Sequence, residues 1–139
     1  APFTNCTPTP GIYFVDKRGA IHELYINAGT DWTWKHLDLA ANTDAPAAQD
    51  DLSGAVMDGK IKSLYFTDVS GTIRELYIDT GRDSRWHHHT VGEHLPPAHS
   101  SLWAMGYDGG KSIFYTSLDV HVHQLYIFKH TDYKWSHCD

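Results

Sequence analysis

The sequence predicts an all-β fold, a β-propeller of four-stranded antiparallel blades with three blades in the chain. One pattern of hydrophobic and polar residues occurs three times, and each copy is followed by Trp-x-His. A period of about 50 residues is typical of propellers, solenoids and arrays. No stretch has helical periodicity over about ten residues. The three copies are IYFVDKRGAIHELYI from Ile12, LYFTDVSGTIRELYI from Leu64 and IFYTSLDVHVHQLYI from Ile113.

The second repeat illustrates the strands expected in one blade. Its segments are rich in β-branched and aromatic residues, which favour strands. Asp58-Gly59 is a two-residue hairpin signal, and Val69-Ser70-Gly71 is a short turn. Four consecutive short antiparallel strands form one propeller blade. The expected strands are Ser53–Met57, Leu64–Thr67, Ile73–Ile78 and Trp86–Val91.

The chain is expected to be a single repeat domain with blades at approximately residues 1–50, 51–100 and 101–139. Ala45–Gln49 and Leu95–His99 contain proline, which cannot occupy a central strand, so we expect them to be crossovers between blades. The first blade must take its inner strand from the segment Phe3–Pro8, where prolines oppose a regular strand.

Three blades cannot close a ring, because known propellers have about four to eight blades. A head-to-tail homodimer would give six blades and would cover every open blade edge. Cys6 and Cys138 lie near the two chain ends, which meet at such a junction. A disulfide between chains and a disulfide within one chain are both compatible with the sequence. We therefore expect a homodimer, with the pairing of Cys6 and Cys138 left open.

The composition excludes several classes of partner. The formal net charge is −6 and no run of Lys or Arg is present, so we expect no binding to nucleic acid or to anionic lipid. No apolar run reaches the roughly 18 residues that a transmembrane helix needs. We therefore expect no membrane insertion.

Three features favour a secreted, extracellular protein. The chain starts at Ala1 without a signal-peptide pattern, which fits a mature chain after removal of a leader. Asn5-Cys6-Thr7 is an acceptor sequence for N-glycosylation, so Asn5 is a candidate for this modification. Two cysteines fit an oxidising compartment.

Repeated polar and aromatic positions are the candidates for function. Alternation along Ile73–Ile78 places Glu75 and Tyr77 on one face of the strand. These side chains suit a sugar-binding site. A carboxylate and a phenol can accept hydrogen bonds from sugar hydroxyl groups, and an indole can stack on the C–H face of the sugar ring. The alternative is that the tryptophans are wedges between blades and the glutamates are turn acceptors. The candidate carbohydrate-binding residues are Glu23, Tyr25, Trp34, Glu75, Tyr77, Trp86, Gln124 and Trp135.

A strand with His or Arg followed by Glu-Leu, and then a downstream Trp, occurs as Ile21-His22-Glu23-Leu24 with Trp34 and as Ile73-Arg74-Glu75-Leu76 with Trp86. The third repeat has the degenerate form Val122-His123-Gln124-Leu125 with Trp135. This pattern resembles the β-propeller lectins of fungi and bacteria, notably the fucose-specific type. The resemblance covers nearly the whole chain, although the motif is short.

The resemblance implies shallow sugar-binding pockets between adjacent blades, in which Glu accepts from sugar hydroxyls, Arg donates to them and aromatic rings stack on the sugar. Arg74 is the candidate donor that it implies. In the third repeat, glutamine at the acidic position indicates a weakened or altered site. The fucose-specific members have an Arg on the preceding strand, just before an aromatic pair. That region here reads Gly11-Ile12-Tyr13, Ser63-Leu64-Tyr65 and Ser112-Ile113-Phe114.

Metal binding and catalysis find little support in the sequence. His87–His89 and His121-x-His123 could place imidazoles on one face, but the four-ligand spacing of a zinc site and a His-Glu-x-x-His motif are missing. There is no Gly-x-Ser-x-Gly motif and no phosphate-binding Gly loop. We therefore expect no metal, no cofactor and no catalytic residue.

The expected function is a lectin that binds glycans multivalently, including fucosylated glycans. The alternative is a non-catalytic protein-interaction or structural propeller.

Overall fold

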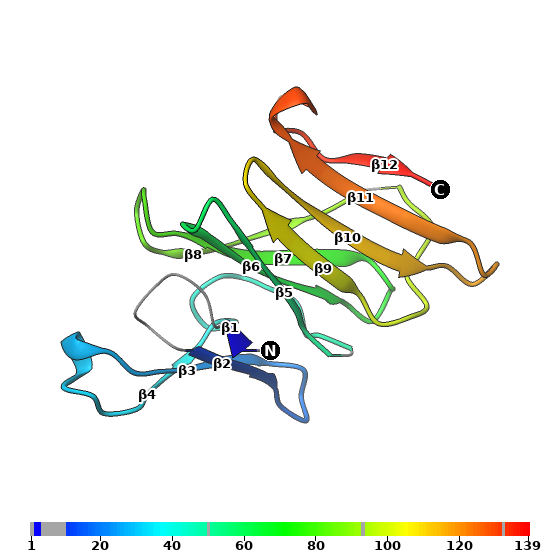
Figure 1. Ribbon diagram of the computed structural model, residues 1–139. Coiled ribbons are helices and arrows are strands. Elements are labelled where there is room, and N and C mark those ends of the chain that lie inside the picture. The colour runs from blue at the N-terminus through cyan, green and yellow to red at the C-terminus, as the bar shows by residue number, and fades with distance from the viewer. Residues whose placement is uncertain (1, 4–10, 50, 93, 132) are drawn as a thin grey trace.

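The computed structural model describes residues 2–3, 11–49, 51–92, 94–131 and 133–139, which form three four-stranded antiparallel sheets (Figure 1). The strands of each sheet pair in chain order, so the all-β prediction is confirmed. The first sheet contains β1 (Pro2–Phe3), β2 (Gly11–Val15), β3 (Ile21–Tyr25) and β4 (Lys35–Asp38). The second contains β5 (Ser53–Met57), β6 (Ile61–Thr67), β7 (Ile73–Asp79) and β8 (Trp86–Thr90). The third contains β9 (Trp103–Tyr107), β10 (Gly110–Thr116), β11 (Val122–Phe128) and β12 (Ser136–Cys138).

The strands of the second sheet follow the sequence pattern closely. β5 has the expected bounds, and β6 begins earlier than expected, at Ile61. The reason is the turn between them, because Asp58 and Gly59 have φ angles of 54° and 63° and reverse the chain within two residues. In the first sheet, β1 covers Pro2–Phe3, and the rest of the expected inner strand lies outside the described residues.

Connections between the sheets carry little regular structure. Ala45–Gln49 and Leu95–His99 lie between sheets, as expected for crossovers, with one isolated bridge between Ala98 and Ser117. Two 3₁₀ segments, η1 (Ala28–Thr30) and η2 (Lys129–Thr131), follow β3 and β11. In the described part of the chain, no helix is long and apolar enough to span a membrane.

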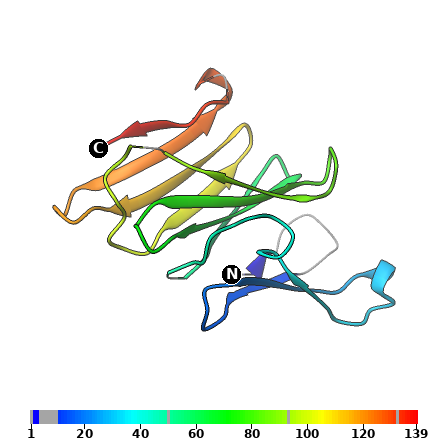
Figure 2. The same cartoon turned by 180° about the vertical axis from the view of Figure 1, so that it is seen from behind.

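The sheets are packed in chain order, with the second sheet between the other two (Figures 1 and 2). Two clusters of buried apolar side chains hold them together. The cluster between the first and second sheets contains Tyr13, Ile21, Leu39, Ala48, Leu64, Phe66 and Leu76. The cluster between the second and third sheets contains Ala55, Tyr65, Ile73, Val91, Leu102, Ala104, Ile113, Tyr115 and Leu125.

The inner strands β5 and β9 approach each other closely. A Cβ atom at Gly106 would collide with the backbone of Val56, so a glycine is required at this point of β9. The backbone N–H of Ala104 donates to Ser53 Oγ over 2.8 Å. These contacts fix the second and third sheets relative to each other at their inner edge.

The outer face of the first sheet lacks the cover that equivalent faces have. Phe14 is 40% exposed, whereas the equivalent Phe66 of the second sheet is fully buried against the first sheet. Ile12 is likewise exposed, whereas the equivalent Leu64 is buried. The outer face of the third sheet is also uncovered, because Val122 on this sheet is 62% exposed. Both outer faces therefore leave apolar side chains uncovered.

Candidate functional site

Two cavities lie at the junctions between sheets, and both are built from the repeated polar and aromatic positions. The first junction cavity, of about 500 Å³, lies between the first and second sheets. The second junction cavity, of about 430 Å³, lies between the second and third sheets. Residues of the first include Tyr13, Glu23, Tyr25, Lys62 and Trp86. Residues of the second include Glu75, Tyr77, His89, Lys111, Tyr133 and Trp135.

In the first junction cavity, donors from both sheets hold the carboxylate of Glu23. The hydroxyl of Tyr13, on the neighbouring strand, donates to Glu23 Oε1 over 2.7 Å. The indole Nε1 of Trp86, from the second sheet, donates to Glu23 Oε2 over 3.3 Å. The rings of Tyr13 and Trp86 meet edge to face, with centroids 5.8 Å apart. Burial, together with the charge of Glu23, raises the pKa of Tyr13, so its hydroxyl remains protonated and donating.

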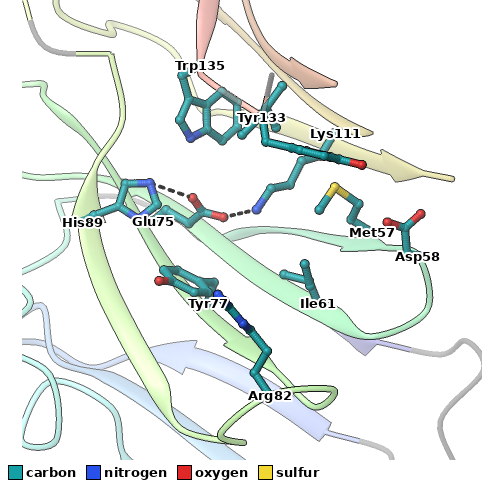
Figure 3. A pocket seen from close by; sticks show the side chains of 11 residues that line it. Met57, Asp58, Ile61, Glu75, Tyr77, Arg82, His89, Lys111, Tyr133 and Trp135 are labelled. Atoms are coloured by element: carbon teal, nitrogen blue, oxygen red, sulfur yellow. Dashed lines mark hydrogen bonds and ion pairs between the residues drawn. The ribbon is translucent and has the colours of Figure 1, made fainter. Parts of the chain in front are cut away.

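In the second junction cavity, the carboxylate of Glu75 is 1% exposed and is surrounded by donors (Figure 3). Tyr65 and Ser63 donate to Oε1 over 2.9 and 2.6 Å. Lys111, from the third sheet, forms an ion pair with the same oxygen. His89 Nε2 lies 3.0 Å from Oε2. Both carboxylate oxygens therefore have partners.

The ionisation of Glu75 follows from these partners. Burial alone would raise its pKa, but the hydrogen bond from His89 and the charge of Lys111 lower the pKa from 4.5 to about 2. Glu75 is therefore a buried carboxylate that stays ionised at neutral pH.

This lowered pKa predicts a loss of stability in acid. The folded state binds the proton of Glu75 more weakly than the unfolded state, so the stabilisation is complete above about pH 4.5 and is lost as the pH falls toward 2. The difference corresponds to about 3 kcal/mol. Urea denaturation between pH 2.5 and 6 would measure it, with Glu75→Gln as the control because the remaining titratable groups, including His89 and Lys111, are common to both proteins. Equal pH dependence of the two proteins would contradict this assignment.

The two cavities are built in the same way, from residues of two successive repeats. In each, a Glu and a Tyr come from one sheet and a Trp comes from the next. Tyr65 and Trp135 meet edge to face with centroids 6.0 Å apart, as Tyr13 and Trp86 do. The sequence motif aligns each Glu with the Trp of its own repeat, whereas the structure joins Glu23 to the Trp of the second repeat. It likewise brings Glu75 together with the Trp of the third repeat.

No protein-family model and no curated protein sequence matches the chain. Solved structures do match. A fucose lectin from Kordia zhangzhouensis, in complex with methyl-fucoside, is 15% identical, with a TM-score of 0.70 over 94% of this chain and 89% of that chain. This chain has a fucose-lectin-like fold. A mutant of AofleA from Arthrobotrys oligospora, with three arginines replaced by alanine, is 11% identical, with a TM-score of 0.68 over 95% of this chain and 38% of that chain.

The remaining candidate residues lie apart from the two cavities of this lectin-like fold. Arg74 is on the opposite face of β7 from Glu75, where its Nε donates to Asp68 Oδ2 over 2.9 Å. Trp34 is half exposed immediately before β4 of the first sheet, and it is not among the residues that line either junction cavity. Gln124 lies on the third sheet, where its Nε2 donates to Ser112 Oγ over 3.2 Å. The structure therefore places Trp34 beside the first sheet and Gln124 on the third.

Two lysines in the cavities were missed by the sequence motif. Lys62 lines the first junction cavity and Lys111 lines the second. Both occupy the second position of their strands, β6 and β10, and each is followed by serine. A recurring Lys-Ser just before the repeated segment is the signal that could have identified them.

Four of the histidines form two close pairs. His22 Nδ1 lies 2.9 Å from His36 Nε2, and the equivalent atoms of His123 and His137 are also 2.9 Å apart. Within the described ranges, no group of three His, Cys, Asp or Glu side chains could hold a metal ion. Cys138 is exposed, with its Sγ 3.6 Å from Gln124 Oε1. Asn5 and Cys6 lie outside the described residues, so their proposed roles stay predictions.

Proposed function

We propose that the protein is a lectin that binds glycans in the two junction cavities. The observation that supports this most is the repeated construction of the cavities, in which a carboxylate from one sheet faces an indole from the next. Carboxylate oxygens accept hydrogen bonds from sugar hydroxyls, and indole faces pack against the C–H face of a sugar ring. The lectin-like fold supports the same reading.

We propose binding without turnover. A glycosidase needs a carboxylic acid that donates a proton to the leaving group and a second carboxylate across the bond. Glu75 is ionised and both its oxygens have partners, so it is poorly suited to donate a proton. Turnover of a labelled oligosaccharide by the purified protein would contradict this part of the proposal.

Fucosylated glycans are the first class to test, because the Kordia lectin was solved with methyl-fucoside. A broad glycan array would test the proposal directly. Selective signal from a set of related glycans supports the lectin. A silent array contradicts it and favours a protein-interaction propeller, in which the repeated aromatic residues form only the core.

Variants of the first junction cavity test where the glycan binds. Glu23→Gln removes the charged acceptor, and Trp86→Ala removes the stacking surface, so each is expected to weaken binding at this cavity by about tenfold or more, which is about 1.4 kcal/mol. Glutamine already occupies this place in the third repeat as Gln124, so the strand tolerates it. Titration calorimetry with the best sugar from the array measures the loss.

The matched control is Trp103→Ala, because Trp103 is exposed and lines neither cavity. It is expected to bind as the unaltered protein does. Unchanged binding in both Glu23→Gln and Trp86→Ala would place the glycan elsewhere. A thermal denaturation curve for each variant separates lost binding from lost folding.

We also propose that two chains close head to tail into a six-bladed ring that is secreted. The uncovered outer faces of the first and third sheets support closure, because equivalent faces inside the chain pack against each other. In such a dimer, Trp34 of one copy and Gln124 of the other would meet at a third kind of junction. Multiple sites on one ring raise the avidity for clustered glycans by roughly 10²–10⁴. The secreted location rests on the acceptor sequence at Asn5 and on the two cysteines.

A further inference from the structure

A lysine accompanies the glutamate in each junction cavity. Lys62 lies with Glu23 in the first cavity, and Lys111 lies with Glu75 in the second. In each case the glutamate comes from one repeat and the lysine from the next. In the third repeat the acidic position is Gln124, and Pro10 of the first repeat occupies the position equivalent to the two lysines. The glutamate and the lysine thus occur together at two positions of the repeat pattern, and both are replaced at the third.

The second cavity shows how the lysine is held. Lys111 is buried, and its ammonium donates to Ser63 Oγ over 2.8 Å and pairs with Glu75. The ammonium also lies 5.7 Å from the ring centroids of Tyr65 and Trp135, within the range of cation–π attraction. These two hydrogen bonds use two of the three N–H groups of Lys111. No hydrogen bond from the third N–H is found among the described residues, and Lys111 lines the cavity (Figure 3).

In the first cavity, the lysine is more exposed and has fewer hydrogen-bond partners. Lys62 is half-buried, and among the described residues no hydrogen bond to its ammonium is found. Burial lowers the pKa of Lys62, and the charge of Glu23 opposes this change. Of the described residues that line this cavity, only Glu23 and Lys62 carry formal charge, so these two charges balance each other. A balanced cavity favours a neutral ligand over an acidic one.

In the second cavity, the cation and the carboxylate come from opposite walls. Ser63 and Glu75 belong to the second sheet, and the ammonium of Lys111, from the third sheet, contacts both. The lysine thus places a cation at the carboxylate from the facing sheet.

We propose that Lys62 and Lys111 are the ligand-binding cations of the two cavities, and that each donates to a hydroxyl of a neutral sugar whose ring packs on the adjacent tryptophan. This inference rests on the proposed lectin function and adds its specificity-determining residues. It gives each chain two charged sites. In the proposed dimer, the junction formed by Gln124 would have neither the glutamate nor the lysine, because Gln124 and Pro10 occupy these positions.

Lys62 is the better residue to test, because its replacement leaves no buried carboxylate without a cation. Lys62→Met removes the charge and keeps most of the length of the side chain. Lys60→Met is the matched control, since Lys60 is exposed on the same hairpin and does not line either junction cavity. Lys62→Arg keeps a cation. All three variants and the unaltered protein would be applied to one array that carries neutral glycans, including fucosylated ones, and sialylated glycans.

We expect signal from neutral glycans, and a fall in the number of sites per chain from two to one in Lys62→Met when the strongest neutral sugar is titrated by calorimetry. Lys60→Met should bind as the unaltered protein does, and Lys62→Arg should retain two sites. Unchanged binding by Lys62→Met, together with loss in Glu23→Gln, would overturn the role of the lysine and leave the lectin function standing. Selective binding of sialylated glycans would overturn the assignment of a neutral ligand. A silent array for the unaltered protein would overturn the lectin function itself.

Discussion

Replacement of Lys111 by methionine is expected to lower the free energy of unfolding by about 3–5 kcal/mol. The side chain of Glu75 is 1% exposed and ionised, and Lys111 is the cation that pairs with it. Removal of Lys111 leaves the charge of the buried Glu75 carboxylate without its paired cation, and a buried charge is poorly solvated. Urea denaturation at pH 7 measures the effect. Such a loss is a large part of the stability of a typical domain, so a fraction of the variant is expected to be unfolded in the absence of denaturant.

The double variant Lys111→Met with Glu75→Gln tests the cause. A neutral amide oxygen can still accept from Tyr65 and Ser63, so the double variant is expected to recover part of the lost stability. Lys62→Met is the matched comparison at the equivalent position. Since Lys62 is half-buried and forms no ion pair among the described residues, its loss is expected to cost under about 1 kcal/mol. A double variant as unstable as Lys111→Met alone would show that packing, and not the ion pair, makes Lys111 important.

The strands could be predicted because their signals are local. Ser53–Met57 ends at Asp58-Gly59, a pair that accepts positive φ angles, so both the strand and its hairpin are encoded within a few residues. Strand alternation likewise predicts that Glu75 and Tyr77 share a face, and the second junction cavity contains both.

The composition of each cavity could not be predicted, because it depends on how one sheet packs against the next. The order of residues along one repeat associates Glu23 with Trp34, since both belong to the same motif. The stacking of sheets instead brings Trp86 to Glu23, and only the three-dimensional arrangement decides between the two. Lys62 and Lys111 were missed for the same reason, because they are far in sequence from the carboxylates that they face.

The inner strand of the first sheet shows a different limit. Prolines in the segment that precedes Gly11 weaken every local strand signal, because proline lacks the N–H that a sheet requires. Of this expected strand, the described residues contain β1 at Pro2–Phe3.

Replacement of Phe66 by alanine is expected to destabilise the chain by about 3–5 kcal/mol, whereas the same change at Phe14 is expected to cost under about 1 kcal/mol in the isolated chain. The two residues hold equivalent places in their repeats, but Phe66 is fully buried in the cluster between the first and second sheets and Phe14 is 40% exposed. Urea denaturation of both variants at low protein concentration compares them directly. Equal losses would mean that the outer face of the first sheet is covered within a single chain.

The same pair of positions tests closure of the ring. In a head-to-tail dimer, the third sheet of a second copy covers Phe14 as the first sheet covers Phe66. Phe14→Glu is then expected to convert a species of twice the chain mass into a monomer, because it places a charge in the new interface. Light scattering coupled to size exclusion measures this mass, and Lys17→Glu, an exposed change in the nearby turn, is the control. A monomeric unaltered protein would contradict the six-bladed ring and leave the two junction cavities as complete sites within one chain.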